Sequence, residues 1–182
     1  MVNFQLWLER TLSSVESVPA FMRTEWGWPV VESVHFIGLT LLFGAIAAWD
    51  LRLLGMAKRV PIAAFHRLVP FAVLGFAINA ASGSMFLMTE PDQYLYNPAF
   101  HFKLLFMALA GLNVVVFYLV VFRRVSGLAP GVDAPTGVKV FGAASLMCWM
   151  AVIVCGRLIT WYRPDTCDPG EAIGFLAGCI PR

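Results

Sequence analysis

Charged side chains are scarce in this chain of 182 residues. They make up 13% of it, whereas a soluble globular domain carries roughly a quarter. Hydrophobic residues make up 59%, and the mean hydropathy is +0.75. This composition excludes an ordinary soluble domain and predicts an integral membrane protein surrounded by a lipid bilayer. The formal net charge of only +2 gives no reason to expect a nucleic-acid partner.

The sequence also lacks the short motifs of several enzyme classes. It has no Gly-rich phosphate loop, no His-Glu-x-x-His pattern and no serine elbow. It has no internal repeat, and a four-span transporter without one would have to oligomerise to form a path. These absences argue against hydrolysis, phosphoryl transfer and transport. They favour an electron-transfer or accessory membrane subunit over a stand-alone enzyme, and they leave a homo-oligomer open.

Four apolar stretches are long enough to cross a bilayer, because a span needs about 20 mainly apolar residues. They cover about 30–50, 68–88, 100–122 and 138–162. We therefore predict an all-α protein in which residues 29–163 form a four-helix transmembrane bundle. Residues 1–28 carry apolar side chains at helical spacing, which predicts an amphipathic helix at the membrane interface. Residues 164–182 form a C-terminal tail.

Basic residues are concentrated in the two loops that follow the first and third spans. These are Arg52, Lys58, Arg59, Arg67, Arg123, Arg124 and Lys139. By the positive-inside rule, these loops face the cytoplasm and both termini face outwards. We therefore expect a multi-pass protein of the bacterial inner membrane with periplasmic termini.

The few cysteines fit this orientation. Cys167 and Cys179 lie in the predicted outer tail, where an oxidising compartment allows them to form a disulfide. Cys148 and Cys155 lie on one face of the fourth span. They are expected to be small core residues, with a soft-metal site as the alternative.

Ionisable residues within the spans are the main functional signal, because such groups are costly in a membrane and usually have a partner or a task. At about 1.5 Å per residue, most of them fall in the outer half of the bundle. This outer group consists of Glu32, His35, His101, Lys103 and Arg157. Asp50 and Arg52 lie at the other end of the first span, where we expect an interfacial pair that seats the helix.

One arrangement that explains the outer group is a b-type haem held between helices. His35 and His101 would supply the two axial ligands, and Lys103 or Arg157 would bind the propionates. The predicted function is then electron transfer between the quinone pool and an outward-facing membrane or periplasmic redox partner.

Three alternatives remain open. Copper could be bound by His35, His101 and a methionine such as Met85, Met88 or Met107. Lys103 and Arg157 could hold an anionic ligand or a quinone head group. The polar group could also be purely structural: Glu32 would bond to His35, Lys103 would extend to the lipid head groups, and the protein would be a non-catalytic, partner-binding subunit.

Three segments carry a resemblance to known proteins: ESVHFIGLTLLFG followed by WDLRLLG, NPAFHFKLLFMALAGLN, and GRLITWY. They resemble a family of bacterial four-span membrane proteins of unknown function, which implies an architecture and no mechanism. The plan is also similar to cytochrome b561-like bundles and to copper-resistance D membrane proteins. Since the chain has three histidines, a cytochrome b561-like arrangement could retain only the outer haem, on His35 and His101.

Overall fold

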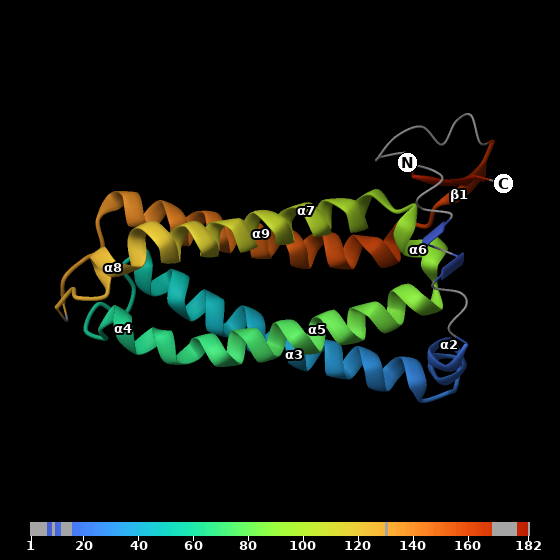
Figure 1. The fold of residues 1–182 in the computed structure, drawn as a ribbon, viewed down its shortest axis with the longest axis horizontal. Coiled ribbons are helices and arrows are strands. Elements are labelled where there is room, and N and C mark those ends of the chain that lie inside the picture. Colours follow the sequence, from blue (N-terminus) through green and yellow to red (C-terminus); the bar gives the residue numbers. More distant parts are fainter. Residues whose placement is uncertain (1–6, 9, 12–15, 130, 169–177, 182) are drawn as a thin grey trace. The chain divides into compact units, whose positions relative to one another are not determined.

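The computed structural model describes residues 7–8, 10–11, 16–129, 131–168 and 178–181, most of which are helical (Figure 1). Four helical segments are long and apolar enough to cross a membrane: Gly27–Leu53, Ile62–Thr89, Pro98–Val125 and Thr136–Trp161. The four spans expected from the sequence are therefore present, as in a multi-pass membrane protein.

The elements follow one another along the chain with short connections. In order they are α2 (Ser17–Met22), α3 (Gly27–Leu53), α4 (Ile62–Phe65), η1 (His66–Leu68), α5 (Val69–Thr89), α6 (Pro91–Leu95), α7 (Pro98–Val116), η2 (Phe117–Val121), α8 (Phe122–Val125), α9 (Thr136–Trp161), β1 (Asp165–Cys167) and β2 (Cys179–Pro181).

Some boundaries differ from the expected ones. The second helical segment begins at Ile62, several residues earlier than predicted, with Pro61 in an extended conformation before it. Proline is tolerated there because the first helical turn does not use its missing N–H. Pro98 begins α7, two residues before the expected start of the third span. The π-helical turn η2 was not foreseen. Of residues 1–28, over which we predicted an amphipathic helix, residues 1–6, 9 and 12–15 lie outside the described residues, and the amphipathic helix stays a prediction.

The chain divides into two compact units, and each long helix contributes to both. We call residues 1–36, 78–105 and 152–182 the terminal unit, and residues 37–77 and 106–151 the loop unit.

The loop unit is held by an apolar core and by one close helix contact. Leu53, Ile62, Phe117, Val121, Val125, Ala134 and Val138 form its buried core. A Cβ atom added to Gly75 would lie 2.5 Å from the Leu42 backbone nitrogen and 2.6 Å from the Gly38 oxygen. Small residues allow helix backbones to approach closely, and Gly38 and Gly75 lie at such an approach between α3 and α5. Gly44, by contrast, has nothing within 4 Å of such an added atom.

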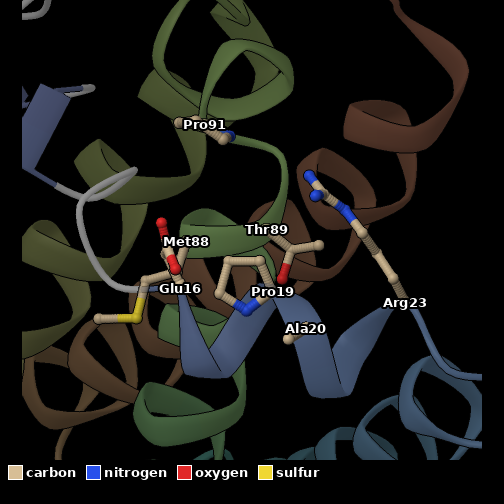
Figure 2. Close-up of a pocket in the computed structure, with 7 residues that line it drawn as sticks. All are labelled: Glu16, Pro19, Ala20, Arg23, Met88, Thr89 and Pro91. Carbon is tan, nitrogen blue, oxygen red and sulfur yellow. The ribbon is translucent and has the colours of Figure 1, made fainter.

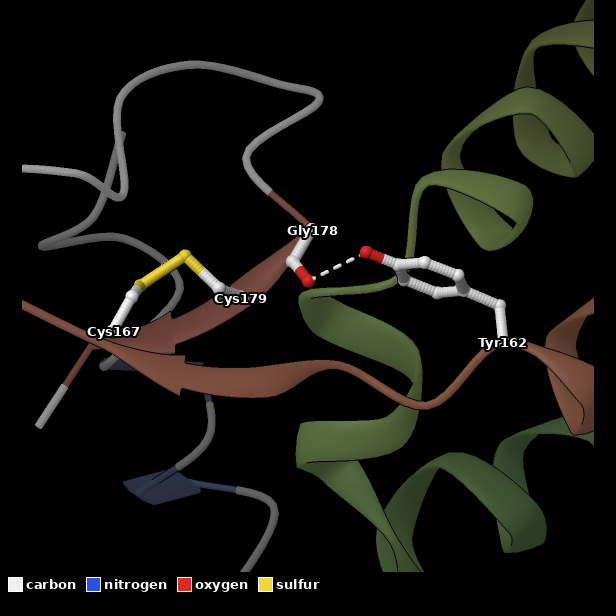
Figure 3. Close-up of a disulfide and its surroundings, with 4 residues drawn as sticks. All are labelled: Tyr162, Cys167, Gly178 and Cys179. Atoms are coloured by element: carbon white, nitrogen blue, oxygen red, sulfur yellow. Dashed lines mark hydrogen bonds between the residues drawn. A yellow bond between two sulfur atoms is a disulfide. The ribbon is translucent and has the colours of Figure 1, made fainter.

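The terminal unit has its own core of Met22, Val31 and Phe86. Its C-terminal tail is attached in two ways, which Figure 3 shows. The predicted disulfide between Cys167 and Cys179 is present and links β1 to β2, which pair in parallel. The Tyr162 hydroxyl also donates a hydrogen bond to the Gly178 carbonyl at 2.8 Å.

The end of α9 is capped by two amides from the α6 region of the same unit. The Nε2 of Gln93 and the Nδ2 of Asn97 both donate to the carbonyls of Ile159 and Tyr162. Carbonyls in the last turn of a helix have no intrahelical partner, so these amides satisfy groups that would otherwise be costly to bury.

Candidate functional site

His35 of α3 contacts α5 within the terminal unit. Its Nδ1 lies 2.8 Å from the Ser82 hydroxyl oxygen, and a Cβ added to Gly83 would lie 3.8 Å from its Cε1. In the purely structural alternative, we expected His35 to bond to Glu32. Instead, the imidazole extends to Ser82 of α5. Ser82 is buried, whereas His35 is half-buried.

A further hydrogen bond of the Ser82 hydroxyl indicates which nitrogen of the His35 imidazole carries the proton. The hydroxyl donates to the Ile78 carbonyl at 2.7 Å, one helical turn earlier. A hydroxyl has one proton, so while Ser82 donates to Ile78 it accepts from His35. In the neutral ring the proton therefore lies on Nδ1, and Nε2 keeps its lone pair. An imidazole oriented in this way by a hydrogen bond at Nδ1 is suited to accept a hydrogen bond or to bind a metal at Nε2.

Aromatic side chains hold this imidazole in place. The ring of Phe86 meets the His35 ring edge-on, with centroids 5.6 Å apart, and packs at 5.0 Å against Trp28. Such contacts restrict the ring's rotation and exclude water from one side of it.

Lys103 of α7 lies in the same unit, within electrostatic range of His35 and of Cys155. A Cβ added to Gly156 would lie 3.8 Å from its Nζ, which places the ammonium against α9. No hydrogen bond or ion pair joins the Lys103 ammonium to any residue in the described ranges. A cation inside an apolar span usually has a polar partner. Because Lys103 has none among the described residues, its ammonium is available to a ligand.

His101 is oriented differently from His35. It is 8% exposed, and its Nε2 lies 2.9 Å from the Leu95 carbonyl oxygen. Because a carbonyl can only accept, Nε2 of His101 carries a proton and donates it. That nitrogen cannot bind a metal unless this hydrogen bond breaks.

Arg157 and Glu32 both lie on exposed helix surface. The Nη1 of Arg157 donates to Thr160 Oγ1 on its own helix at 2.6 Å. Glu32 lies near Tyr94 of α6, where burial, followed by the charges of Glu90 and Glu32, raises the tyrosine pKa to about 12. The geometry thus brings together His35, Ser82 and Lys103 and leaves Arg157 and Glu32 at the surface.

These positions can be compared with the demands of a haem. Two axial imidazoles and nearby cations are required. His35 and Lys103 meet these demands, and His101 does not, because its Nε2 donates to Leu95. Among the described residues, no group of three or more His, Cys, Asp or Glu side chains could hold a metal ion. A haem ligated through Nε2 of both histidines does not fit this hydrogen bonding.

In the loop unit, Asp50 and Arg52 form no ion pair with each other. Arg52 is 1% exposed; its Nε donates to the Val60 carbonyl and its Nη2 to those of Lys58 and Val132. Asp50 is 4% exposed and forms a side-chain hydrogen bond with Ser145 of α9. The expected interfacial pair is therefore not formed, and each residue has its own partners at the end of α3.

Sequence reasoning missed two other polar contacts of the loop unit. Asp133 is held by Lys58 at 2.8 Å and Lys139 at 3.0 Å, so it joins the two basic loops. His66 lies 3.1 Å from the Tyr118 hydroxyl, among the rings of Trp49 and Phe122. Lys58 lies 75 residues from Asp133, and His66 lies 52 residues from Tyr118, so neither contact could be read from spacing along the chain.

Comparison with known proteins finds no family model that matches this chain, and no curated protein or solved structure similar to it. The geometry above is therefore the basis for assigning a function.

Proposed function

We propose that this protein is a membrane subunit of electron transfer that binds the head group of a quinol at His35 and Lys103. The observation that carries the proposal is the pair of hydrogen bonds of Ser82, to Nδ1 of His35 and to the Ile78 carbonyl. The Nδ1–H of His35 is held by Ser82, and the Nε2 lone pair remains to accept a hydrogen bond inside a membrane span.

A quinol matches the two side chains. Its hydroxyl groups both donate and accept, so one can donate to Nε2 of His35 and the other can accept from the Lys103 ammonium. Its apolar tail suits the surrounding spans, whose exposed side chains are mostly hydrophobic. Apolar surroundings with a few convergent polar groups are the usual composition of a small-molecule site.

The same geometry disfavours a carboxylate or phosphate as the ligand. An anion would pair with Lys103 but would meet the lone pair of neutral His35 without a proton to share. A ligand with an O–H group satisfies both side chains, so the proposal is for a quinol rather than an anionic lipid.

A haem b remains the second candidate, because the orientation of His35 also suits an axial ligand. The other axial ligand would have to be a group other than Nε2 of His101. This candidate adds a clear prediction, namely a Soret absorption band that depends on His35.

We further propose that the protein lies in a bacterial inner membrane with both termini in the periplasm. The proposal is supported by the basic loops and by the Cys167–Cys179 disulfide in the tail, since disulfides form in oxidising compartments. The quinol head would then bind in the outer half of the membrane, where a periplasmic redox partner could exchange electrons with it.

The test is binding of decylubiquinol and of decylubiquinone to the purified protein in nanodiscs, followed by quenching of tryptophan fluorescence. Trp28 packs on the phenylalanine that contacts His35, so it reports on this site. We expect the quinol to bind more tightly than the quinone, which has no hydroxyl to donate to His35. His35→Leu and Lys103→Met should each weaken quinol binding about tenfold or more.

His66→Leu is the matched control, because this histidine belongs to the loop unit and should not affect binding. Equal quinol binding by the wild type, His35→Leu and Lys103→Met would refute the proposal. A Soret band that His35→Leu abolishes would replace the quinol by haem. A colourless protein that binds no quinol would leave the structural, partner-binding function.

A further inference from the structure

A pocket of about 480 Å³ lies between α2 and the α5–α6 junction of the terminal unit. It is lined by Glu16, Pro19, Ala20, Arg23, Met88, Thr89 and Pro91 (Figure 2). The quinol proposal does not use this pocket, since it contains neither His35 nor Lys103.

The pocket carries one charge of each sign, on opposite sides of Pro19, as Figure 2 shows. Glu16 precedes α2 and Arg23 follows it, and both are exposed. Neither side chain forms a hydrogen bond or ion pair with another residue in the described part of the chain. Two opposite charges that share a pocket without pairing can be bridged by a ligand that carries both charges.

The remaining lining favours a lipid over a soluble ligand. Pro19, Met88 and Pro91 supply apolar surface, and the Thr89 hydroxyl already donates to the Met85 carbonyl. The pocket also lies at the end of a segment long and apolar enough to cross a membrane, Ile62–Thr89, which is where lipid head groups are found.

We infer that this pocket binds the head group of phosphatidylethanolamine. The Arg23 guanidinium binds the phosphate, since its planar array of N–H donors matches phosphate oxygens. The Glu16 carboxylate accepts hydrogen bonds from the ethanolamine ammonium. The acyl chains lie along the apolar surface of the neighbouring span.

The experiment measures lipid association by native mass spectrometry of the full-length protein, with phosphatidylethanolamine and phosphatidylglycerol compared at equal concentration. We expect phosphatidylethanolamine to bind more tightly, because phosphatidylglycerol has no ammonium for Glu16. Glu16→Gln should remove this preference by weakening phosphatidylethanolamine binding about threefold to tenfold. Arg23→Gln should weaken the binding of both lipids, because both carry a phosphate.

Glu25→Gln and Arg163→Gln are the matched controls, since both residues are exposed in the same unit and outside the pocket. Their lipid preference should equal that of the wild type. Unfolding temperatures in lipid-free detergent check that Glu16→Gln and Arg23→Gln still fold, as expected of exposed positions.

Water-soluble phosphoethanolamine separates a lipid site from a site for the free head group. It should compete only weakly, because it lacks the acyl chains. Full competition at low millimolar concentration would overturn the lipid assignment. An unchanged lipid preference in Glu16→Gln, or a wild-type preference for phosphatidylglycerol, would overturn the proposal as a whole.

Discussion

Arg52 illustrates how a single buried charge can organise backbone in this protein. Its guanidinium binds three carbonyls, on Lys58 and Val60 in the loop after α3 and on Val132 before α9. Because arginine donates from several nitrogens in a fixed geometry, it can bind diverging carbonyls that a lysine could not reach together. Arg52 therefore acts as a positioning residue for the loops, and its carbonyl partners could not be inferred from the sequence.

We expect Arg52→Ala to lower the free energy of unfolding by about 2–4 kcal/mol, because it leaves buried carbonyls without donors. Arg52→Lys should recover only part of this loss. Unfolding by increasing sodium dodecyl sulfate in mixed micelles measures both. Arg59→Ala is the control, since Arg59 is exposed; an equal loss in that variant would contradict the carbonyl-binding role.

Asp133 is a second single residue that affects stability, and its effect depends on pH. Hydrogen bonds from Lys58 and then Lys139 lower its pKa from the ordinary 3.8 to about 2. A lowered folded-state pKa stabilises the fold fully above the unfolded value, and this stabilisation is lost as pH falls from about 4 to about 2. We expect the acid side of a pH–stability curve to flatten over that window in Asp133→Asn. A curve identical to that of the wild type would show that the two lysines do not stabilise the carboxylate.

At the scale of the elements, the contact between α3 and α5 in the loop unit depends on one glycine. A side chain at Gly75 would collide with the backbone of α3 at Gly38 and Leu42, and backbone cannot move aside as a flexible side chain can. The sequence could not distinguish Gly75 from Gly44 or Gly111, which have open space around them.

We expect Gly75→Ala to lower the free energy of unfolding by about 1–3 kcal/mol through this collision. Gly111→Ala is the matched control, since nothing lies within 4 Å of its added Cβ. That variant should be neutral or stabilising by up to about 1 kcal/mol, because alanine favours helix over glycine. Unfolding in mixed micelles compares the two, and equal effects would refute the close approach of the helices.

The capping of α9 by Asn97 is a second interaction between elements. Asn97 is fully buried; its Nδ2 donates to two terminal carbonyls of α9, and its Oδ1 accepts from the Ala99 N–H. The sequence indicated only a turn at Asn97-Pro98. The carbonyls that Asn97 caps lie more than sixty residues further along the chain.

We expect Asn97→Asp to lower the free energy of unfolding by about 1–3 kcal/mol, because it keeps the acceptor for Ala99 but loses both donors to α9. Asn97→Ala should cost more, since it also loses the acceptor. Hydrogen exchange at the last turn of α9, measured by mass spectrometry, should accelerate in both variants. Unchanged exchange there would show that the cap does not stabilise the helix end.

At the scale of the whole molecule, topology follows from charge and cysteine placement. Most basic residues lie in or next to the connections after the first and third spans: Arg52, Lys58, Arg59, Arg67, Arg123, Arg124 and Lys139. The disulfide lies in the C-terminal tail. In the orientation that we propose, both termini lie outside, so that the disulfide faces the periplasm and the basic loops face the cytoplasm.

Labelling of introduced cysteines by a membrane-impermeant maleimide in intact cells tests this topology. Asp92→Cys, in α6, should react with the reagent from outside. Ala57→Cys, in the loop after α3, should react only after the membrane is permeabilised. Both variants carry Cys148→Ser and Cys155→Ser to remove the free thiols. The reverse labelling pattern would invert the proposed orientation.

The sequence by itself determined the class of this protein, its four spans and the disulfide between Cys167 and Cys179. Each depends on local composition or on residues close together in the chain, such as a run of apolar side chains or two cysteines in one tail. The sequence also identified His35 and Lys103 as candidates, because ionisable residues in a span are rare and can be recognised without knowing where their side chains point.

Only the tertiary structure decided what these residues do. In the folded chain, His35 contacts Ser82 and His101 contacts Leu95. Arg157 lies on an exposed surface, and Arg52 donates to carbonyls and not to Asp50. The physical reason is that the protonated nitrogen of a histidine depends on its hydrogen-bond partner. Partners on other helices are set by packing, which the order of residues along the chain does not reveal.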